Sequence, residues 1–80
     1  MNDDIELSVK KRQIRRIVTW MKAHGGITQQ DAYEIGVTRL SGRIYDMKQL
    51  GYNIRDKWEH GLNKYNEKCK WKKYYLEGME

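Results

Sequence analysis

The spacing of apolar residues changes once along this chain, at Gly51, and that change constrains the fold more than any other feature. Before Gly51 the apolar residues recur at three- and four-residue steps, which is the period of a helix buried on one side. After it they alternate with polar residues, which is the period of a half-buried strand. A chain of 80 residues cannot divide its apolar residues between two cores. We therefore expect one domain over residues 1–80, mainly α with a C-terminal β-hairpin, with an ordered core at 8–76 between short acidic tails.

The first expected helix covers residues 7–21 and continues to the glycines that follow His24. Asp4 and Ser8 are both candidates for its N-cap. Gly25 and Gly26 end it, because glycine accepts the left-handed conformation of a helix C-cap. The residues expected on its apolar stripe are Leu7, Ile14, Ile17, Val18 and Met21.

A short second helix is expected to begin after Thr28. Asp31 follows Thr28 at the spacing of a capping box, with Asp in the place of the more usual Glu. Ala32 and Ile35 are expected to face inward, and Gly36 ends the helix.

A third helix follows directly. Thr38 is its expected N-cap and Gly51 its end. The positions expected to be buried are Leu40, Ile44, Met47 and Leu50.

The remainder of the chain predicts a β-hairpin with a polar tip at residues 60–68. In the first strand, Tyr52, Ile54 and Trp58 fall on one face, opposite Asn53, Arg55, Lys57 and Glu59. The second strand covers residues 69–76, and its register is open, because a slip of one residue exchanges its two faces. Its buried pair is either Trp71 with Tyr75 or Tyr74 with Leu76.

The net charge is +5, from 16 Lys and Arg residues against 11 Asp and Glu. A basic excess on a small surface favours an anionic partner such as nucleic acid, although solubility alone is the alternative. The basic residues form two blocks, one at residues 10–22 and one, interleaved with Trp and Tyr, at residues 55–73.

Other functional classes find no support in the sequence. Cys69 is the only cysteine, so no intramolecular disulfide can form and a reducing cytoplasm is expected. No apolar stretch approaches the ~20 residues that a membrane span needs. His24 and His60 lack neighbours at metal-ligand spacing. We therefore expect no membrane segment, no metal, no cofactor and no enzymatic activity.

The order of three helices and a hairpin is typical of a winged helix-turn-helix domain. The segment HGGITQQDAYEIGVTRLSGRIYDMKQLGYNI, from His24 to Ile54, resembles the helix-turn-helix domain of small bacteriophage proteins. The chain departs from that pattern at Asp31, where Glu is usual, and at Met47, where Leu is usual. The resemblance implies a winged helix of phage or prophage origin that binds double-stranded DNA.

The third helix carries most of the expected contacts. Arg39 and Arg43 offer bidentate donors to guanine or phosphate, and Gln49 can pair with adenine. Gly42 is interpreted as allowing close backbone approach to DNA or to another helix. The alternative for the two arginines is solvation or pairing with Asp46 or Glu34. The full set on this helix is Thr38, Arg39, Ser41, Gly42, Arg43, Tyr45, Lys48 and Gln49.

The wing supplies a second group, expected along a minor groove or the phosphates. A plain surface hairpin with ordinary lysines is the alternative. The residues are Lys57, Asn63, Lys64, Tyr65 and Lys68. Trp20, Trp58 and Trp71 are interpreted as core residues of a chain without Phe, rather than as stacking platforms.

Two functions remain. The first is a DNA-binding regulator of transcription in the cytoplasm of a bacterial host; such a regulator usually pairs over two half-sites, so a homodimer is expected although no dimerisation helix is visible. The second is a phage-encoded inhibitor that binds a host protein or a nucleic-acid-handling defence complex. An inhibitor requires an exposed apolar patch, for which the candidates are Tyr45, Tyr65 and Tyr74.

Overall fold

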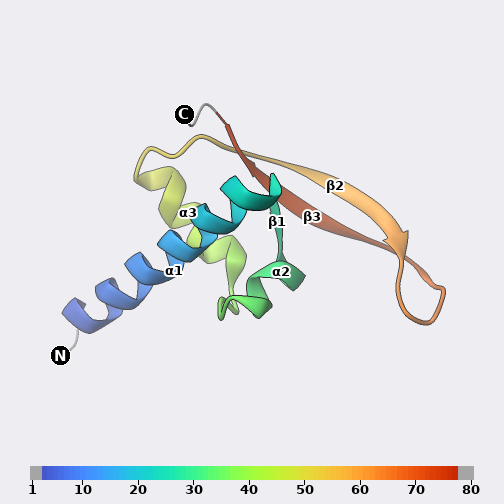
Figure 1. The fold of residues 1–80 in the computed structure, drawn as a ribbon, viewed down its shortest axis with the longest axis horizontal. Coiled ribbons are helices and arrows are strands. Elements are labelled where there is room, and N and C mark those ends of the chain that lie inside the picture. The colour runs from blue at the N-terminus through green and yellow to red at the C-terminus, as the bar shows by residue number, and fades with distance from the viewer. Residues whose placement is uncertain (1–2, 78–80) are drawn as a thin grey trace.

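The structure is a computed structural model that describes residues 3–77, with side chains from residue 7 onward. Three helices and a three-stranded antiparallel sheet alternate in the order α1-β1-α2-α3-β2-β3 (Figure 1). The sheet order is β1-β3-β2, so the C-terminal strand lies in the middle. The elements are α1 (Asp3–His24), β1 (Ile27–Thr28), α2 (Gln29–Glu34), α3 (Leu40–Gln49), β2 (Ile54–Leu62) and β3 (Lys68–Leu76). The expected order of three helices followed by a hairpin is confirmed.

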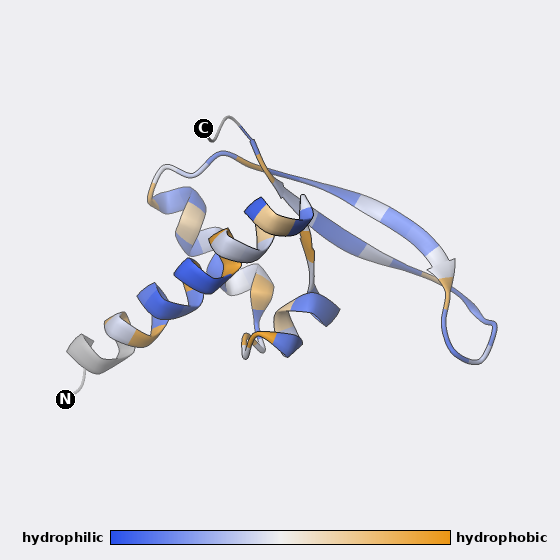
Figure 2. Cartoon of the chain, viewed as in Figure 1, coloured by the Kyte–Doolittle hydropathy of each residue, from blue (hydrophilic) through white to orange (hydrophobic). Residues whose placement is uncertain are grey.

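One apolar core joins the helices to the base of the sheet. The apolar segments lie where α1, α3 and β1 meet, whereas the distant part of the β2–β3 hairpin is largely hydrophilic (Figure 2). Ile17, Ala32 and Met47 are completely buried. The full core is Ile14, Ile17, Met21, Ile27, Ala32, Val37, Leu40, Ile44, Met47 and Ile54.

Helix α1 begins earlier than the capping pattern predicts. It starts at Asp3, so Asp4 and Ser8 both lie inside the helix and neither is its N-cap. Its first turns extend past the core, which leaves Leu7 exposed although it lies on the predicted apolar stripe. The expected end is confirmed, since the helix stops at His24 and Gly25 has a φ of 85°.

Helix α2 has the predicted capping box. The Asp31 amide donates to Thr28 Oγ1 at 3.2 Å, and the Thr28 amide donates to Asp31 Oδ2 at 3.0 Å. Ala32 is buried, and Ile35 is partly buried against the core. A local sequence pattern therefore determines where this helix begins.

Helix α3 is not capped by Thr38, contrary to the prediction. Its N-cap is Arg39, whose side chain makes no capping hydrogen bond. The Leu40 amide instead donates to Gln29 Oε1 at 3.0 Å, and Gln29 Nε2 donates to the Val37 carbonyl at 3.1 Å. A side chain from α2 thus supplies the acceptor that a local N-cap would provide.

Three of the four inward positions predicted on α3 are buried, namely Leu40, Ile44 and Met47. Leu50 is the exception, with 67% of its surface exposed. It is the C-cap residue, and the chain turns at Gly51 with a φ of 101°. The Leu50 amide still donates to the Asp46 carbonyl at 3.1 Å, so Leu50 continues the helical direction but lies outside the core cluster.

The strands of the hairpin are longer than predicted, and more of their side chains are exposed. Its register runs from Ile54 opposite Leu76 to Leu62 opposite Lys68, which shortens the tip to residues 63–67. Tyr74 and Leu76 pack on the core, so the second of the two open registers is the one observed. Trp58 is 52% exposed.

The interpretation of the three tryptophans as core residues is therefore largely wrong. Trp58 and Trp71 are 52% and 36% exposed, and neither belongs to the core cluster or packs against it. Trp20 alone packs against the core, partly buried, with its ring centroid 4.2 Å from that of His24.

Candidate nucleic-acid interface

Helix α3 presents a polar face to solvent, on the side opposite Leu40, Ile44 and Met47. Tyr45 is 63% exposed at the centre of this face. Ser41, Lys48 and Gln49 are also exposed on this face, because the core packing of α3 turns them outward. Thr38 and Arg39 are exposed just before the helix, and all six residues belong to the predicted DNA-contacting set.

Arg43 is placed differently from the other predicted contacts. Its side chain is 21% exposed and crosses toward α1, where Nη1 donates to Gln13 Oε1 at 3.4 Å. Its Nε lies 3.1 Å from Asp46 Oδ2 as an ion pair, without the alignment of a hydrogen bond. The structure therefore favours the alternative of pairing within the chain, with Asp46 as the partner.

Gly42 has open space in front of it. A Cβ added at this position would meet no atom of another residue within 4 Å. No neighbour of this chain requires a glycine there, so close approach to another helix of the same chain does not explain it. Approach of an external molecule remains the interpretation of Gly42.

The wing tip is organised by Asn63. Its Oδ1 accepts from the amides of Tyr65 at 2.8 Å and Glu67 at 3.1 Å, and its Nδ2 donates to Glu67 Oε1 at 2.9 Å. These bonds use both polar atoms of the side chain to shape the turn. Lys64 and Tyr65 are exposed beside it, with Lys64 Nζ 5.3 Å from the centre of the Tyr65 ring.

The two faces of the wing separate residues that the sequence grouped together. Lys57 alternates onto the face that also holds Glu59 and Trp71, whereas Lys68 lies on the opposite face. Lys57 Nζ is 5.6 Å from the centre of the Tyr75 ring, at the base of the hairpin. Lys57 is therefore not part of one cluster with the residues of the tip.

Lys70 and Lys72 share the face of Lys68 and were missing from the predicted site. Their Nζ atoms lie 4.9 and 5.1 Å from the centre of the Trp58 ring. The signal was present in the sequence, because lysine at every second position of a strand places a row of cations on one face. We call Lys68, Lys70 and Lys72 the wing lysine row.

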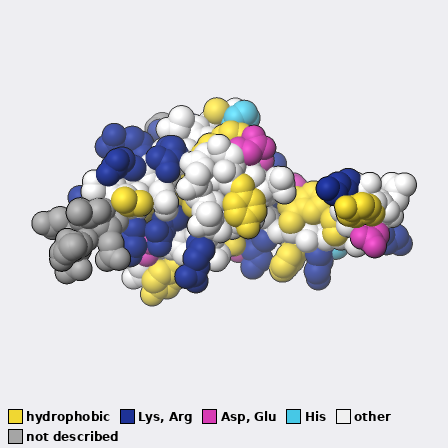
Figure 3. Space-filling view, turned by 90° about the horizontal axis from the view of Figure 1, so that it is seen from below, with side chains coloured by type: hydrophobic (Ala, Val, Ile, Leu, Met, Phe, Trp, Pro, Cys, Tyr) yellow, Lys and Arg dark blue, Asp and Glu magenta, His cyan; other side chains and the backbone are white. Residues whose placement is uncertain are grey.

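A cleft of about 680 Å³ lies between α2, the start of α3 and the wing. Ser41 from α3 and Asn63 from the wing both line it, together with Tyr33 and Trp71. Basic side chains lie over both the helical body and the wing when the molecule is seen from below (Figure 3). The fold thus brings the beginning of α3 and the distal wing to one concave surface.

Glu59 links the two strands on the other face of the wing. It accepts hydrogen bonds from Trp71 Nε1 at 3.0 Å and from the Tyr75 hydroxyl at 3.2 Å. Desolvation raises the pKa of Tyr75, and the hydrogen bond and charge of Glu59 raise it further. Burial also raises the pKa of Tyr74, helped by the charge of Asp56. Both hydroxyls therefore stay protonated at neutral pH.

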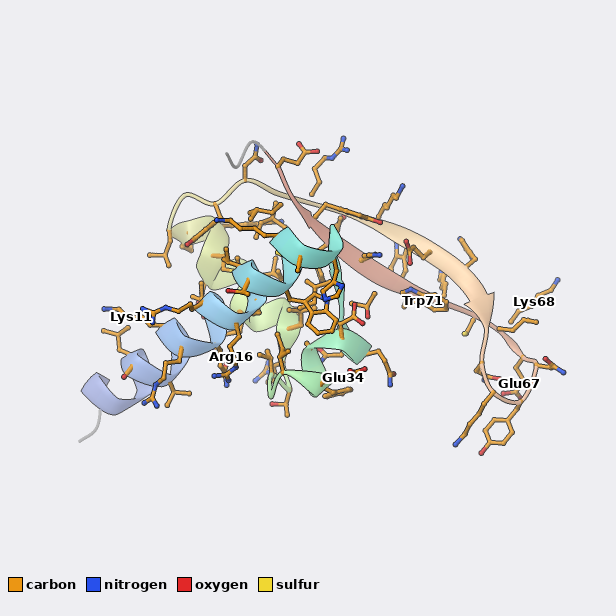
Figure 4. The ribbon with its side chains drawn as sticks, viewed as in Figure 1. Lys11, Arg16, Glu34, Glu67, Lys68 and Trp71 are labelled. Atoms are coloured by element: carbon orange, nitrogen blue, oxygen red, sulfur yellow. The ribbon has the colours of Figure 1, made fainter. Side chains whose placement is uncertain are left out.

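Arg16 has a structural contact that the sequence did not indicate. Its side chain points from α1 toward the turn after α2 (Figure 4), and its Nε donates to the Ile35 carbonyl at 2.8 Å. This bond satisfies a carbonyl at the end of α2. At least one residue of the first basic block therefore supports the fold.

A comparison with protein families identifies the architecture. A model described as a winged helix-turn-helix domain matches residues 12–76. The chain belongs to this family. Winged helix-turn-helix domains bind DNA and are typically not enzymes, which supports a DNA-binding role here. No curated protein and no solved structure matches the chain.

Neither a membrane span nor a metal cluster is found in this winged helix-turn-helix domain over the part that the structure describes. None of the helices within residues 3–77 combines the length and apolar character needed to cross a membrane. Over the same residues, His, Cys, Asp and Glu side chains form no group of three or more that could hold a metal ion.

Proposed function

We propose that this protein is a sequence-specific binder of double-stranded DNA and regulates transcription in a phage or prophage. Helix α3 enters the major groove and the wing lies along the backbone, in the cytoplasm of the bacterial host. One observation carries the proposal: Ser41 at the start of α3 and the wing residues Asn63 and Lys72 line the same cleft. A duplex bound there is contacted at base edges and at phosphates together.

The base-reading part of the proposal rests on α3. Gln49 has the amide that pairs with adenine, and Arg39 has the guanidinium that pairs with guanine or a phosphate. Both side chains are exposed, and Gly42 leaves room for the helix to approach the groove closely. Arg43 is less suited to this role, because its guanidinium already pairs with Asp46 on α3 and donates to Gln13 on α1.

The phosphate part rests on the wing lysine row. Its three cations project from one face of β3, and Lys64 adds a fourth at the tip. Lysine contacts to phosphate release counterions and add affinity without sequence preference. The wing therefore supplies affinity while α3 supplies specificity.

Fluorescence anisotropy against labelled duplexes, selected from a random pool, tests the base-reading helix. Arg39→Ala and Gln49→Ala should each weaken binding to the preferred duplex by about 1–3 kcal/mol and relax its sequence preference. Arg15→Ala removes the same charge from the exposed side of α1 and serves as the control. If Gln49→Ala lost no more DNA affinity than the Arg15→Ala control and kept the same sequence preference, α3 would be excluded from the groove.

The wing is tested by the salt dependence of the same binding. Combining Lys68→Ala with Lys70→Ala should reduce the slope of log affinity against log salt by about 2, with sequence preference unchanged. A preserved slope would show that the wing lysine row does not contact phosphate.

A second candidate function is supported by two exposed large side chains, one on α3 and one just after it. Leu50 and Tyr45 are 67% and 63% exposed, which suits a protein partner better than a DNA backbone. Of the three tyrosines named for such a patch, Tyr45 and Tyr65 are exposed, but Tyr74 packs on the core. In this proposal the protein inhibits a host nucleic-acid-handling complex. Weak DNA binding that vanishes at physiological salt on every duplex would favour it.

A further inference from the structure

The outer edge of β2 is a strand edge without a partner among the described residues. The sheet order β1-β3-β2 leaves β2 paired on one side only, over a strand of nine residues. In Figure 1 this edge runs along the outside of the wing. Trp58 sits at the middle of β2 with 52% of its surface exposed. Such an edge offers backbone donors and acceptors to another strand.

Symmetry limits how two copies of this edge can pair. Two antiparallel β2 strands related by a two-fold axis must have that axis perpendicular to the sheet, so the central residue faces its own copy. The residues on either side of the centre then face each other. Each choice of central residue therefore defines one complete set of cross-strand pairs.

Every choice centred on a charged residue of β2, namely Arg55, Asp56, Lys57 or Glu59, places like charges in direct opposition. A centre at Lys57 or Glu59 sets that residue against itself, and a centre at Asp56 does the same while also opposing Arg55 to Lys57. Like charges directly opposite each other destabilise a strand pair. A centre at His60 avoids self-repulsion but leaves Glu59 opposite Gly61, without a charge partner.

A centre at Trp58 gives the opposite result. It sets Lys57 against Glu59 of the second copy, and Asp56 against His60 of the second copy, twice each because of the symmetry. The two Trp58 side chains meet at the axis. We propose that the β2 edge is a homodimer interface with Trp58 on its two-fold axis, and that the occupant of this edge is a second copy of the chain.

Charged residues usually protect an edge strand from pairing. In β2, Lys57 and Glu59 carry opposite charges on either side of Trp58. These charges therefore favour the register centred on Trp58 instead of preventing association. An interface of one strand pair is small, and the dimer is accordingly expected to be concentration-dependent.

The arrangement also lets the described residues 3–77 pair without a further helix. Pairing at β2 produces one continuous sheet, in the order β1-β3-β2 followed by the same strands of the second copy in reverse. Because the axis is perpendicular to that sheet, the helices of both copies lie on the same side of it. The DNA-binding surfaces of the two copies would then lie on the same side of the dimer. Dimerisation through β2 does not require that the protein binds DNA.

Sedimentation equilibrium of the full chain, without DNA, tests the proposal. The wild-type mass should rise with concentration from that of one chain, 9.7 kDa, toward twice that value. Lys57→Glu alone, or Glu59→Lys alone, should raise the dissociation constant at least about tenfold, because each places like charges in opposition. An equimolar mixture of the two variants should dimerise again, since every altered position then faces an opposite charge.

Lys64→Glu makes the same charge change at the wing tip, outside the interface, and should leave the dissociation constant unchanged. Far-ultraviolet circular dichroism verifies that each variant is folded. If a single variant does not fold, the doubly substituted chain Lys57→Glu with Glu59→Lys replaces the mixture and should dimerise like the wild type. A wild-type chain that stays monomeric to millimolar concentration would overturn the proposal. So would a dimer that tolerates Lys57→Glu, responds equally to Lys64→Glu, or is not restored by charge exchange.

Discussion

The helical body and the distal wing of this small domain are ordered by different interactions. In the body, the helices and the base of the sheet share an apolar core, with residues such as Ile17 and Met47 fully buried. In β2, no residue after Ile54 is buried. The body is thus held by removal of apolar surface from water, and the wing is not.

The wing relies instead on contacts between its own two strands. Glu59 accepts hydrogen bonds from Trp71 and Tyr75, and the cations of Lys70 and Lys72 lie over Trp58. Cross-strand pairs of these kinds contribute about 0.2–1 kcal/mol each. A surface stabilised in this way can carry a high density of charge, because few of its side chains are needed for packing.

The largest expected effect contrasts one leucine from each region. Leu40→Ala opens a cavity in the core and should lower the free energy of unfolding by about 2–5 kcal/mol. Leu62→Ala, on the exposed wing, should cost less than about 1 kcal/mol. Urea denaturation followed by circular dichroism measures both. Equal losses of unfolding free energy in the two variants would mean that the wing contributes to the core as much as the helical body does.

Gln29→Ala should give the next largest effect. The substitution leaves the Leu40 amide and the Val37 carbonyl without their partner, at an expected cost of about 1–3 kcal/mol in unfolding free energy. Gln30→Ala, at the exposed neighbouring position, is the matched control and should change stability little. Identical denaturation midpoints for the two variants would show that solvent replaces the amide of Gln29.

Glu59→Ala should loosen the wing and leave the body intact. It removes the acceptor shared by Trp71 and Tyr75, at a local cost of about 1 kcal/mol. Amide hydrogen exchange should accelerate in the part of β2 that follows Ile54 and in the β3 residues paired with it. The exchange rates in α1 and α3 should stay unchanged. Faster exchange throughout the molecule would indicate that wing and body unfold together.

The smallest expected effect appears at alkaline pH. Burial raises the pKa of Tyr74 in the folded protein above its ordinary value of about 10, so the unfolded chain releases this proton first as the pH rises. Folding stability should therefore fall as the pH rises above that ordinary value. Thermal unfolding at pH 9 and 11 should show a smaller loss for Tyr74→Phe than for the wild type. The same loss in both would assign the alkaline effect to other groups.

Patterns of a few neighbouring residues predicted much of this structure. The capping box of Thr28 and Asp31, the buried stripe of α3 through Leu40, and the turn at Gly51 are all as expected. Each depends on backbone geometry within one or two helical turns. The outward face of α3 follows from the same periodicity, so most of its candidate DNA contacts could be placed without a structure.

The errors arose where a residue's partner lies elsewhere in the fold. Thr38 was expected to cap α3, but Gln29 from α2 fills that place. For Arg43 the sequence left DNA contact and pairing with Asp46 or Glu34 open, and the structure shows the Asp46 pair together with a hydrogen bond to Gln13 on α1 that the sequence did not indicate. Trp58 was expected in the core because nothing in the alternation of a strand shows where the covering helices end.

By itself, the sequence determined the helices, their glycine ends, the hairpin and a basic surface, because apolar periodicity, capping and net charge depend on residue type and short spacing. Tertiary structure alone decided the register of β3 and the partners of Gln29 and Arg43. These features depend on contacts between residues that are far apart in the sequence. The wing projects past the helices, and this projection leaves some of its aromatic side chains exposed to a partner.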